Sequence, residues 1–432
     1  MAYDNSKSIF REYSKITPGG VQSNFRFEAP HPLYFRRAQG SRLWDFDGNE
    51  YVDYIAGYGS IVLGHRDPKV LKKVSECLDY GLTSGVETEL SYHVSRRLHD
   101  MIPSAEMVRF STSGTEAVMH AIMLARAKTG ARRIVKAEGA YHGWYDVVAV
   151  SHHPPVHEAG PTRNPRPVPI SGGLDPCMIE STIIVPYNDI SSLEEALKSN
   201  RGEVAPVILE PVCFNSGAIL PVNGYLEQVR ELTSKLDVPL IFDEVITGFR
   251  LAPGGAQQYF HVQTDISVFG KALGNGFPIS AVVGREDILS LSAPGGRVGY
   301  GGTYNGNQIS LAAADATLEA LADGQIQTKL SNMTSTIIEW VREAAETERV
   351  NLRTQGIGGQ FQIYFTDKEV RDYREAAGIN RAMYSDLQRD LRLEGVLLHP
   401  DPLFHHGVTA SHTREDLERL VQAITKHLRK TP

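Results

Sequence analysis

The sequence has few cysteines and no long apolar run. Its three cysteines, Cys77, Cys177 and Cys213, lie far apart among 432 residues, and none belongs to a Cys-x-x-Cys pair. This spacing argues against a disulfide framework and against a zinc site. No apolar run approaches the roughly 18 residues of a membrane-spanning helix, and the first residues lack the apolar core of a secretory signal. We therefore expect a cytoplasmic protein with no membrane partner.

An excess of positive charge is also absent. Lys and Arg total 44 against 51 Asp and Glu, which gives a formal net charge of −7. Proteins that bind nucleic acid neutralise phosphates with a basic face, so nucleic acid is not an expected partner. Hydrophobic residues make up 41% of the chain, which is typical of a globular protein, and a chain this long can bury a large core without disulfides.

Strand and helix patterns alternate along the middle of the chain. The predicted strands are short apolar runs at 107–110, 134–135, 182–185, 206–209, 238–242, 266–269 and 280–283. Helical periodicity occurs between several of these runs, for example at 225–236. Such alternation predicts an α/β layer fold with a mainly parallel sheet.

The two ends of the chain have a different pattern. Arg42–Phe46 and Glu50–Tyr54 read as strands around Asp-Gly-Asn, a typical hairpin turn. Apolar residues alternate at 361–365, as in a half-buried strand. The last helix is predicted to begin at Thr413, with Asp416 in the capping-box position.

These patterns predict three parts. An N-terminal segment, 1–60, contains the hairpin and packs with a small domain. A large domain covers 61–310, and a small α+β domain covers 311–432. An irregular segment at 153–176, rich in Pro and Gly, is expected to be an active-site lid or a surface loop.

Four features follow predicted strands, where open α/β sheets bind ligands. Ser113-Gly114-Thr115 begins a predicted helix and could bind an anion through free N–H groups, although helix capping alone explains it too. Asp243 ends an apolar strand and needs a cationic or hydrogen-bonding partner there. Lys271 could form an imine, although an isolated lysine is more often in a surface ion pair. Tyr141 offers a flat ring that could stack on a planar ligand, although such a residue taken alone is more often part of the core.

Taken together, the four features fit one kind of ligand. The phosphate of such a ligand would bind at 113–115, a protonated ring nitrogen at Asp243, an aldehyde at Lys271, and the ring face at Tyr141. Pyridoxal phosphate carries all of these groups.

Several longer motifs surround these positions in a fixed order. They are Pro18–Val21, Ser113–Ala117, Tyr141–Gly143, Glu210-Pro211, Asp243–Arg250, the Lys271 segment and Gly302–Asn307. With these motifs the sequence resembles the class III (subgroup II) pyridoxal-phosphate aminotransferases and, within them, the glutamate-1-semialdehyde 2,1-aminomutase-like branch. The resemblance implies fold type I, with a large α/β/α domain, a mainly parallel sheet and a smaller α+β domain.

The resemblance also implies roles for individual residues. Lys271 would bind pyridoxal phosphate as an aldimine and then move a proton, and Asp243 would keep the ring nitrogen protonated. Tyr141 and Val245 would pack on the two ring faces, and Asn215 would lie near the phenolic oxygen. The implied cofactor site comprises Ser113, Gly114, Thr115, Tyr141, His142, Asn215, Asp243, Val245, Lys271 and, from the second subunit of a homodimer, Thr303.

The implied substrate site is less regular. Arg26 lies where the aminomutase-like branch has an arginine for the substrate carboxylate, and a guanidinium suits a carboxylate well. Ser23, Tyr58 and Trp144 are the other substrate-binding candidates. Tyr58 and Trp144 would add aromatic surface, which favours an apolar or aryl side chain.

Two departures from the aminomutase pattern bear on the reaction. Phe404 stands where we expect a glutamate, and segment 153–176 lacks the Gly/Ser-rich character of the aminomutase gating loop. Our main prediction is therefore an aminotransferase that moves an amino group between a carboxylate-bearing amino acid and a keto acid through a pyridoxamine phosphate form. The alternatives are glutamate-1-semialdehyde aminomutase, or a racemase or lyase on the same scaffold.

Other site types find little support. His152, His153, His405 and His406 lack the helical spacing of metal ligands, so we expect solvated loop histidines and no metal. No complete G-x-G-x-x-G follows a predicted strand, which argues against a nicotinamide dehydrogenase. The absence of a basic face argues against a DNA-binding sensor.

Overall fold

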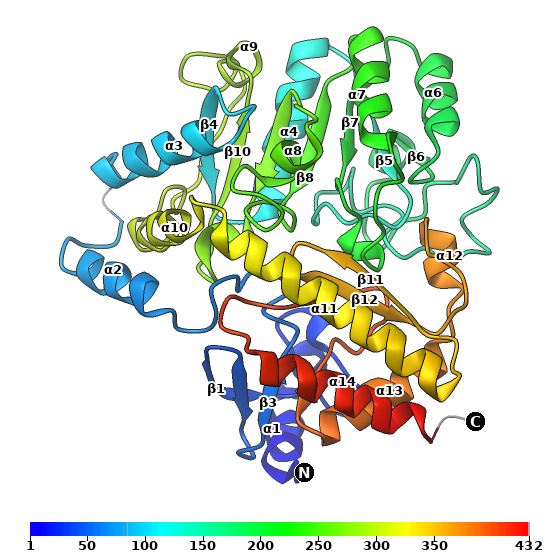
Figure 1. The fold of residues 1–432 in the computed structure, drawn as a ribbon. Coiled ribbons are helices and arrows are strands. Elements are labelled where there is room, and N and C mark those ends of the chain that lie inside the picture. The colour runs from blue at the N-terminus through cyan, green and yellow to red at the C-terminus, as the bar shows by residue number, and fades with distance from the viewer. Residues whose placement is uncertain (84, 431–432) are drawn as a thin grey trace.

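A seven-stranded sheet forms the centre of the computed structural model, which describes residues 1–83 and 85–430 (Figure 1). The strand order is β4-β10-β9-β8-β7-β5-β6. The strands are β4 (Met107–Ser111), β5 (Arg133–Ala137), β6 (Thr182–Val185), β7 (Val204–Leu209), β8 (Leu240–Glu244), β9 (Ile266–Phe269) and β10 (Ser280–Gly284). Only β10 runs antiparallel to its neighbours β4 and β9. The predicted α/β fold with a mainly parallel sheet is confirmed.

Helices cover both faces of this sheet because successive strand side chains point to opposite sides. Ile208 and Ile241 pack with α4 (Gly114–Thr129). Their neighbours Leu209 and Phe242 pack with α6 (Ile190–Ser199) and α7 (Tyr225–Lys235) on the other face. The remaining helices of this region are α2 (Pro68–Leu78), α3 (Glu89–Met101), α5 (Pro176–Glu180), α8 (Gly255–Phe260), α9 (Glu286–Leu289) and α10 (Gln308–Leu321). Strands buried on both faces account for the apolar runs seen in the sequence.

A second sheet joins the two ends of the chain. The predicted hairpin is present as β2 (Arg42–Asp45) and β3 (Glu50–Asp53), preceded by β1 (Phe35–Gln39) and by α1 (Asp4–Tyr13). A short strand from the C-terminal part, β13 (Val396–Leu397), pairs with β3 in parallel. The N-terminal segment thus lies against the C-terminal part, although the domain boundaries drawn from the sequence remain a prediction.

The C-terminal part has its own three-stranded sheet under long helices. Its strands are β11 (Arg353–Ile357), β12 (Gln360–Tyr364) and β14 (His406–Gly407), and its helices are α11 (Gln325–Glu348), α12 (Tyr373–Ala377), α13 (Arg381–Leu393) and α14 (Arg414–Leu428). Thr413 and Asp416 form the predicted capping box at the start of α14. The strand predicted at 361–365 is present as β12, but the prediction that it is half-buried is wrong, because all five residues of β12 are buried. Gln360 and Gln362 look polar in the sequence but lie inside the fold.

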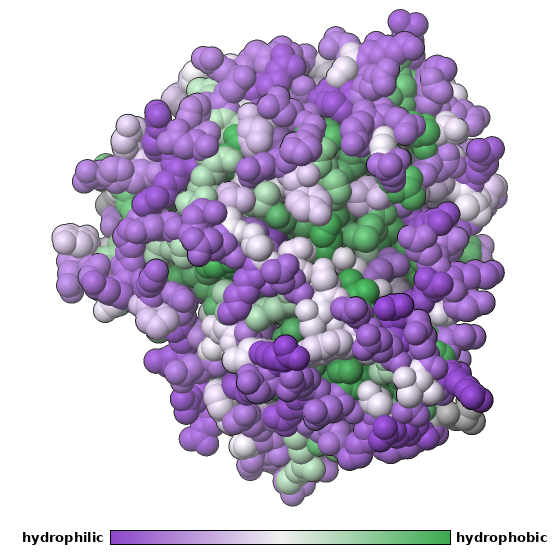
Figure 2. Space-filling model, in the orientation of Figure 1, coloured by the Kyte–Doolittle hydropathy of each residue, from purple (hydrophilic) through white to green (hydrophobic). Residues whose placement is uncertain are grey.

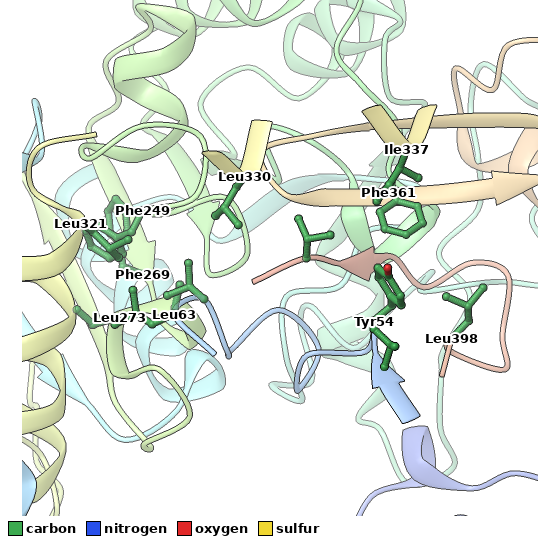
Figure 3. Packing of buried hydrophobic residues seen from close by; sticks show 14 of the residues in the cluster. Tyr54, Leu63, Phe249, Phe269, Leu273, Leu321, Leu330, Ile337, Phe361 and Leu398 are labelled. Atoms are coloured by element: carbon green, nitrogen blue, oxygen red, sulfur yellow. The ribbon is translucent and has the colours of Figure 1, made fainter. Parts of the chain in front are cut away.

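One hydrophobic core connects the large sheet with the C-terminal part. Figure 3 shows Phe249, Phe269 and Leu321 at one end of this core and Tyr54 and Phe361 at the other. The visible face in Figure 2 is mostly hydrophilic, with hydrophobic residues gathered across its middle. Among the described residues, no helix is both long and apolar enough to span a bilayer. Because the large sheet and the C-terminal part share this core, the site described below lies where segments from both parts meet.

Candidate active site

A cavity of about 330 Å³ lies where the carboxyl ends of the central strands meet the start of α4. Tyr141 follows β5, Glu210 follows β7, Asp243 lies in β8 and Lys271 follows β9. The predicted cofactor residues that line the cavity are Ser113, Gly114, Thr115, Tyr141, His142, Asn215, Asp243, Val245 and Lys271. Thr303 is exposed and does not line the cavity of its own chain. The fold therefore brings together residues that are 158 positions apart in the sequence (113 to 271).

The N-terminus of α4 forms one end of the cavity. Ser113 caps the helix: its Oγ accepts from the Glu116 N–H at 3.4 Å, and the Glu116 carboxylate accepts from the Ser113 N–H at 2.8 Å. Capping thus uses Ser113, while the N–H groups of Gly114 and Thr115 lie in the first turn, where no helical acceptor exists. A Cβ at Gly114 would come within 3.2 Å of Val245. This end can therefore hold an anion such as phosphate.

Asp243 forms a buried pair with His142. The Asp243 carboxylate lies 2.7 Å from His142 Nδ1 and accepts the Val245 N–H at 3.1 Å. Both side chains are buried. Burial lowers the pKa of His142, and the negative charge of Asp243 opposes that shift. The pair keeps a carboxylate oriented in the cavity, where it can bind a protonated ring nitrogen.

Lys271 begins a short 3-10 helix, Lys271–Gly274, with a left-handed φ of 44°. Its side chain is half-buried at the cavity wall, and its Nζ has no hydrogen-bond or ion-pair partner among the described residues. Burial lowers the pKa of Lys271 to about 8, although the negative charges of Glu210 and Asp243 oppose the shift. The surface ion pair considered from the sequence is excluded. A partly neutral amine can instead react with an aldehyde.

Glu210 is a site residue that the sequence analysis named only within a motif and to which it gave no role. Its carboxylate accepts the Tyr141 N–H at 3.0 Å and the Asn215 side-chain amide at 3.1 Å. Burial and, secondarily, the charge of Asp243 raise the pKa of Glu210 to about 7. The signal was present, because Glu210 follows an apolar strand in the same way that Asp243 ends one.

The four predicted substrate residues lie outside this cavity. Arg26 is exposed and has no partner among the described residues, but its charge acts on Tyr58, whose hydroxyl donates to the Phe25 carbonyl at 2.8 Å. Ser23 precedes the single turn Asn24–Arg26. Trp144 is 44% exposed and stacks on Phe25, with ring centroids 6.2 Å apart. Tyr58 and Trp144 contact Phe25, and Ser23 and Arg26 lie within two positions of it in the chain, so the four form a group around Phe25.

Phe25, which the sequence analysis did not single out, connects that group to the cavity. Its ring contacts Tyr141 edge-on at 5.5 Å and Phe404 at 5.3 Å between centroids. A second hollow of about 190 Å³ lies beside it, lined by residues 24–25, Trp144, 152–155 and 168–170. The neighbourhood of the cavity is thus rich in aromatic side chains.

The prediction of solvated loop histidines is wrong. His152 and His153 are half-buried and stack at 3.9 Å between ring centroids, and the His153 ring contacts the Asn215 carbonyl. His405 and His406 are buried at β14. Burial lowers the pKa of all four. Sequence spacing could not reveal this, because the packing partners lie on distant segments. No group of three His, Cys, Asp or Glu side chains in the described ranges is placed to hold a metal ion.

The cavity offers groups for every part of a phosphorylated pyridine aldehyde: a helix N-terminus, a buried carboxylate, an aromatic ring and an amine with a lowered pKa. The fold and the site therefore define a pyridoxal-phosphate-dependent enzyme that acts on amines. Residues 26–423 match the family Aminotransferase class-III. The chain belongs to this family.

Known proteins similar to this chain include both mutases and transaminases. The glutamate-1-semialdehyde 2,1-aminomutase of Methanothrix thermoacetophila is 39% identical over 99% of this chain and 97% of its own length. An omega-transaminase from Sphaerobacter thermophilus has a TM-score of 0.92 at 30% identity, covering 98% of this chain and 97% of its own. A beta-phenylalanine aminotransferase from Variovorax paradoxus has a TM-score of 0.88 at 29% identity, covering 98% and 93%.

Proposed function

We propose that this chain is a glutamate-1-semialdehyde 2,1-aminomutase, which moves an amino group between neighbouring carbons of one substrate. The observation that carries the proposal is the 39% identity, over nearly the full length of both chains, to the aminomutase of M. thermoacetophila. The relatives support this activity, an alternative in the sequence analysis, better than the aminotransferase that we predicted first.

The roles of the residues follow from the geometry of the cavity. Pyridoxal phosphate, when bound, draws electrons away from the carbon that bears the amino group. Asp243, held by His142, binds the proton on the ring nitrogen. The Lys271 amine takes a proton from one carbon and delivers it to another, because a pKa near 8 lets it exist in both forms near neutral pH.

The remaining residues bind and orient. Gly114 and Thr115 bind the phosphate at the start of α4, and Tyr141 and Val245 hold the two ring faces. Arg26 binds the substrate carboxylate, since its guanidinium is exposed beside the aromatic group and has no partner among the described residues.

We also infer a homodimer in which Thr303 of the partner subunit binds the phosphate. Leu78, Tyr80, Leu82 and Tyr92 are each more than half exposed on the segment from α2 to α3. Clustered exposed apolar residues are typical of an interface with another chain. Thr303 itself is exposed and does not line its own cavity, as expected of a residue shared with a second copy.

An aminotransferase for an amino acid with an apolar or aryl side chain is the second candidate. The observation that favours it is the aromatic group of Phe25, Trp144 and Phe404 beside the cavity. Phe404 is only 6% exposed, so an acidic side chain at this position would be buried among rings.

One experiment separates these candidates. The purified protein, loaded with pyridoxal phosphate or pyridoxamine phosphate, is given glutamate-1-semialdehyde alone. Formation of 5-aminolevulinate without a keto acid supports the aminomutase. Turnover of aryl amino acids only in the presence of a keto acid supports the second candidate. Exchange of solvent protons into an amino acid without amino transfer would point to a racemase or lyase and would contradict both.

A further inference from the structure

One peptide group at the cavity is hydrogen-bonded on both sides by buried ionisable side chains, and burial brings the pKa of each, Lys136 and Glu210, to about 7. The carbonyl of Ala140 accepts from Lys136 Nζ at 2.8 Å. The N–H of the same peptide, which belongs to Tyr141, donates to the Glu210 carboxylate at 3.0 Å. Lys136 lies in β5 and is fully buried, and Glu210 follows β7 and is 3% exposed. Side chains at the ends of two strands, β5 and β7, thus hydrogen-bond the two sides of the Ala140–Tyr141 peptide group.

All of the hydrogen bonds that Lys136 Nζ donates go to backbone carbonyls of this segment. Besides Ala140, it donates to the carbonyls of Val148, at 3.4 Å, and Val150. An ammonium group has three donors, so the three carbonyls satisfy it without a carboxylate in direct contact. A buried charge costs stability unless it is fully hydrogen-bonded. The lysine therefore ties the segment 140–150, whose residues 141–143 line the cavity, to the end of β5.

Glu210 holds a second wall in the same way. Its other oxygen accepts the Asn215 side-chain amide at 3.1 Å and the Asn215 backbone N–H at 3.3 Å. Three N–H donors thus face two carboxylate oxygens. A carboxylate is the one common side chain that accepts all three without offering a competing donor.

The Ala140–Tyr141 peptide group lies next in the chain to His142, the residue that pairs with Asp243. Tyr141 lines the cavity, and the next residue, His142, lies 2.7 Å from the Asp243 carboxylate. We propose that Lys136 and Glu210 are positioning residues that clamp the Ala140–Tyr141 peptide and so hold Tyr141 and His142 in register with Asp243. The peptide links the two side chains without a salt bridge between them, and both hydrogen bonds are strongest when Lys136 and Glu210 are ionised.

The proposed role of Lys136 and Glu210 concerns the cofactor cavity that both candidate functions would use. It does not depend on which substrate the enzyme takes. It is tested first in the cofactor-free protein by amide hydrogen exchange, read at peptides that contain Tyr141 and His142. Glu210→Gln removes the charge and turns one acceptor into a donor that faces N–H groups. Lys136→Met keeps the apolar stem and removes all three donors. Each variant should speed exchange at Tyr141 by at least about tenfold.

Glu244→Gln is the matched control. Glu244 is also buried, at the end of the apolar strand β8, and also accepts backbone N–H groups, those of Ala256 and Gln257. It does not line the cavity. This variant should change exchange near 256–257 and leave Tyr141 at the wild-type rate.

The double variant of Lys136 and Glu210 adds a second criterion. Because both residues act on one peptide, the double variant should exchange only about as fast at Tyr141 as the faster single variant. If Lys136→Met does not fold, Lys136→Arg replaces it, since arginine keeps the charge but not the geometry of the three bonds. In the loaded enzyme, kcat should fall in Glu210→Gln while KM stays within about twofold of wild type.

Three results would overturn the proposal. Wild-type exchange at Tyr141 in Glu210→Gln would show that the carboxylate does not hold the peptide. Equal acceleration in Glu244→Gln would indicate general loosening of the fold. Multiplied effects in the double variant would mean two independent contacts. Because exchange is measured without substrate or cofactor, these results stand even if the proposed reaction proves wrong.

Discussion

The lowered pKa of Lys271 can be tested by titrating its amine directly. Only the neutral amine reacts with an acylating reagent, so the labelling rate follows the neutral fraction. With a pKa of about 8, half of Lys271 is neutral at pH 8. An ordinary lysine with a pKa near 10.4 is then about 0.4% neutral. The neutral fraction of Lys271 should therefore exceed that of an exposed lysine by roughly a hundredfold at this pH.

The assay is brief acetylation of the cofactor-free protein between pH 6 and 11, followed by mass spectrometry of the Lys271 peptide. Lys72, whose side chain is 77% exposed, serves as the reference within the same sample. Labelling of Lys271 rises with pH with a midpoint near 8, well below the pH at which an ordinary lysine becomes half neutral. Poor access of the reagent to the cavity lowers the rate at every pH alike and leaves the midpoint unchanged.

A second variant identifies the physical cause. Burial lowers the pKa of Lys271, while the negative charges of Glu210 and Asp243 raise it. Asp243→Asn removes one opposing charge and should move the midpoint further down. A midpoint near 10.4 in the wild type, or a rise in Asp243→Asn, would refute the argument that burial prepares this amine for reaction.

Three other substitutions test the site and the fold. Lys271→Ala should abolish turnover and covalent cofactor uptake, seen in the absorbance spectrum, with little change in melting temperature. Gly143→Ala should weaken cofactor binding in calorimetry, because φ is 96° and a Cβ would come within 2.5 Å of Thr115 Oγ1. Asp416→Asn should cost about 2 kcal/mol in urea unfolding at pH 7, because it weakens the hydrogen-bonded ion pair of buried Asp416 with the partly exposed Arg42. Burial alone would raise the pKa of Asp416, but the hydrogen bonds and the ion pair together lower it. Its stabilisation is therefore present above the unfolded value near 3.9 and is lost as pH falls through the lower folded value.

The features predictable from the sequence are those set by local patterns. The hairpin turn between β2 and β3 depends on adjacent residues, and so does the capping box of Thr413 and Asp416. The ends of the central strands were visible as apolar runs. Because parallel strands end at one edge of a sheet, Asp243 and Lys271 could be placed together before their contacts were known.

The features that could not be predicted depend on contacts between distant segments. The Nδ1 atom of His405 lies 3.2 Å from the carbonyl oxygen of Phe214, 191 positions away in the chain. The residues next to His405 in the sequence therefore do not reveal that it is buried. Gln362 is buried because its amide donates to the carbonyl of Pro402, at 2.7 Å, and to that of Phe404. The place of Phe25 between Tyr141 and Phe404 has the same origin. The periodicity of hydrophobic residues indicates which face of a segment is exposed to solvent. It does not indicate which other segments pack against that segment.

The pairing of the N-terminal hairpin with the C-terminal part has a consequence for synthesis on the ribosome. β3 pairs with β13, the Ser41 hydroxyl bonds Asp416, 375 positions later, and the Tyr54 hydroxyl bonds the Asp416 carbonyl. Contacts this far apart raise the contact order and slow folding. The central sheet can assemble during translation. The N-terminal strand β3, in contrast, keeps an unpaired edge until the last fifty residues, which contain β13, have been translated.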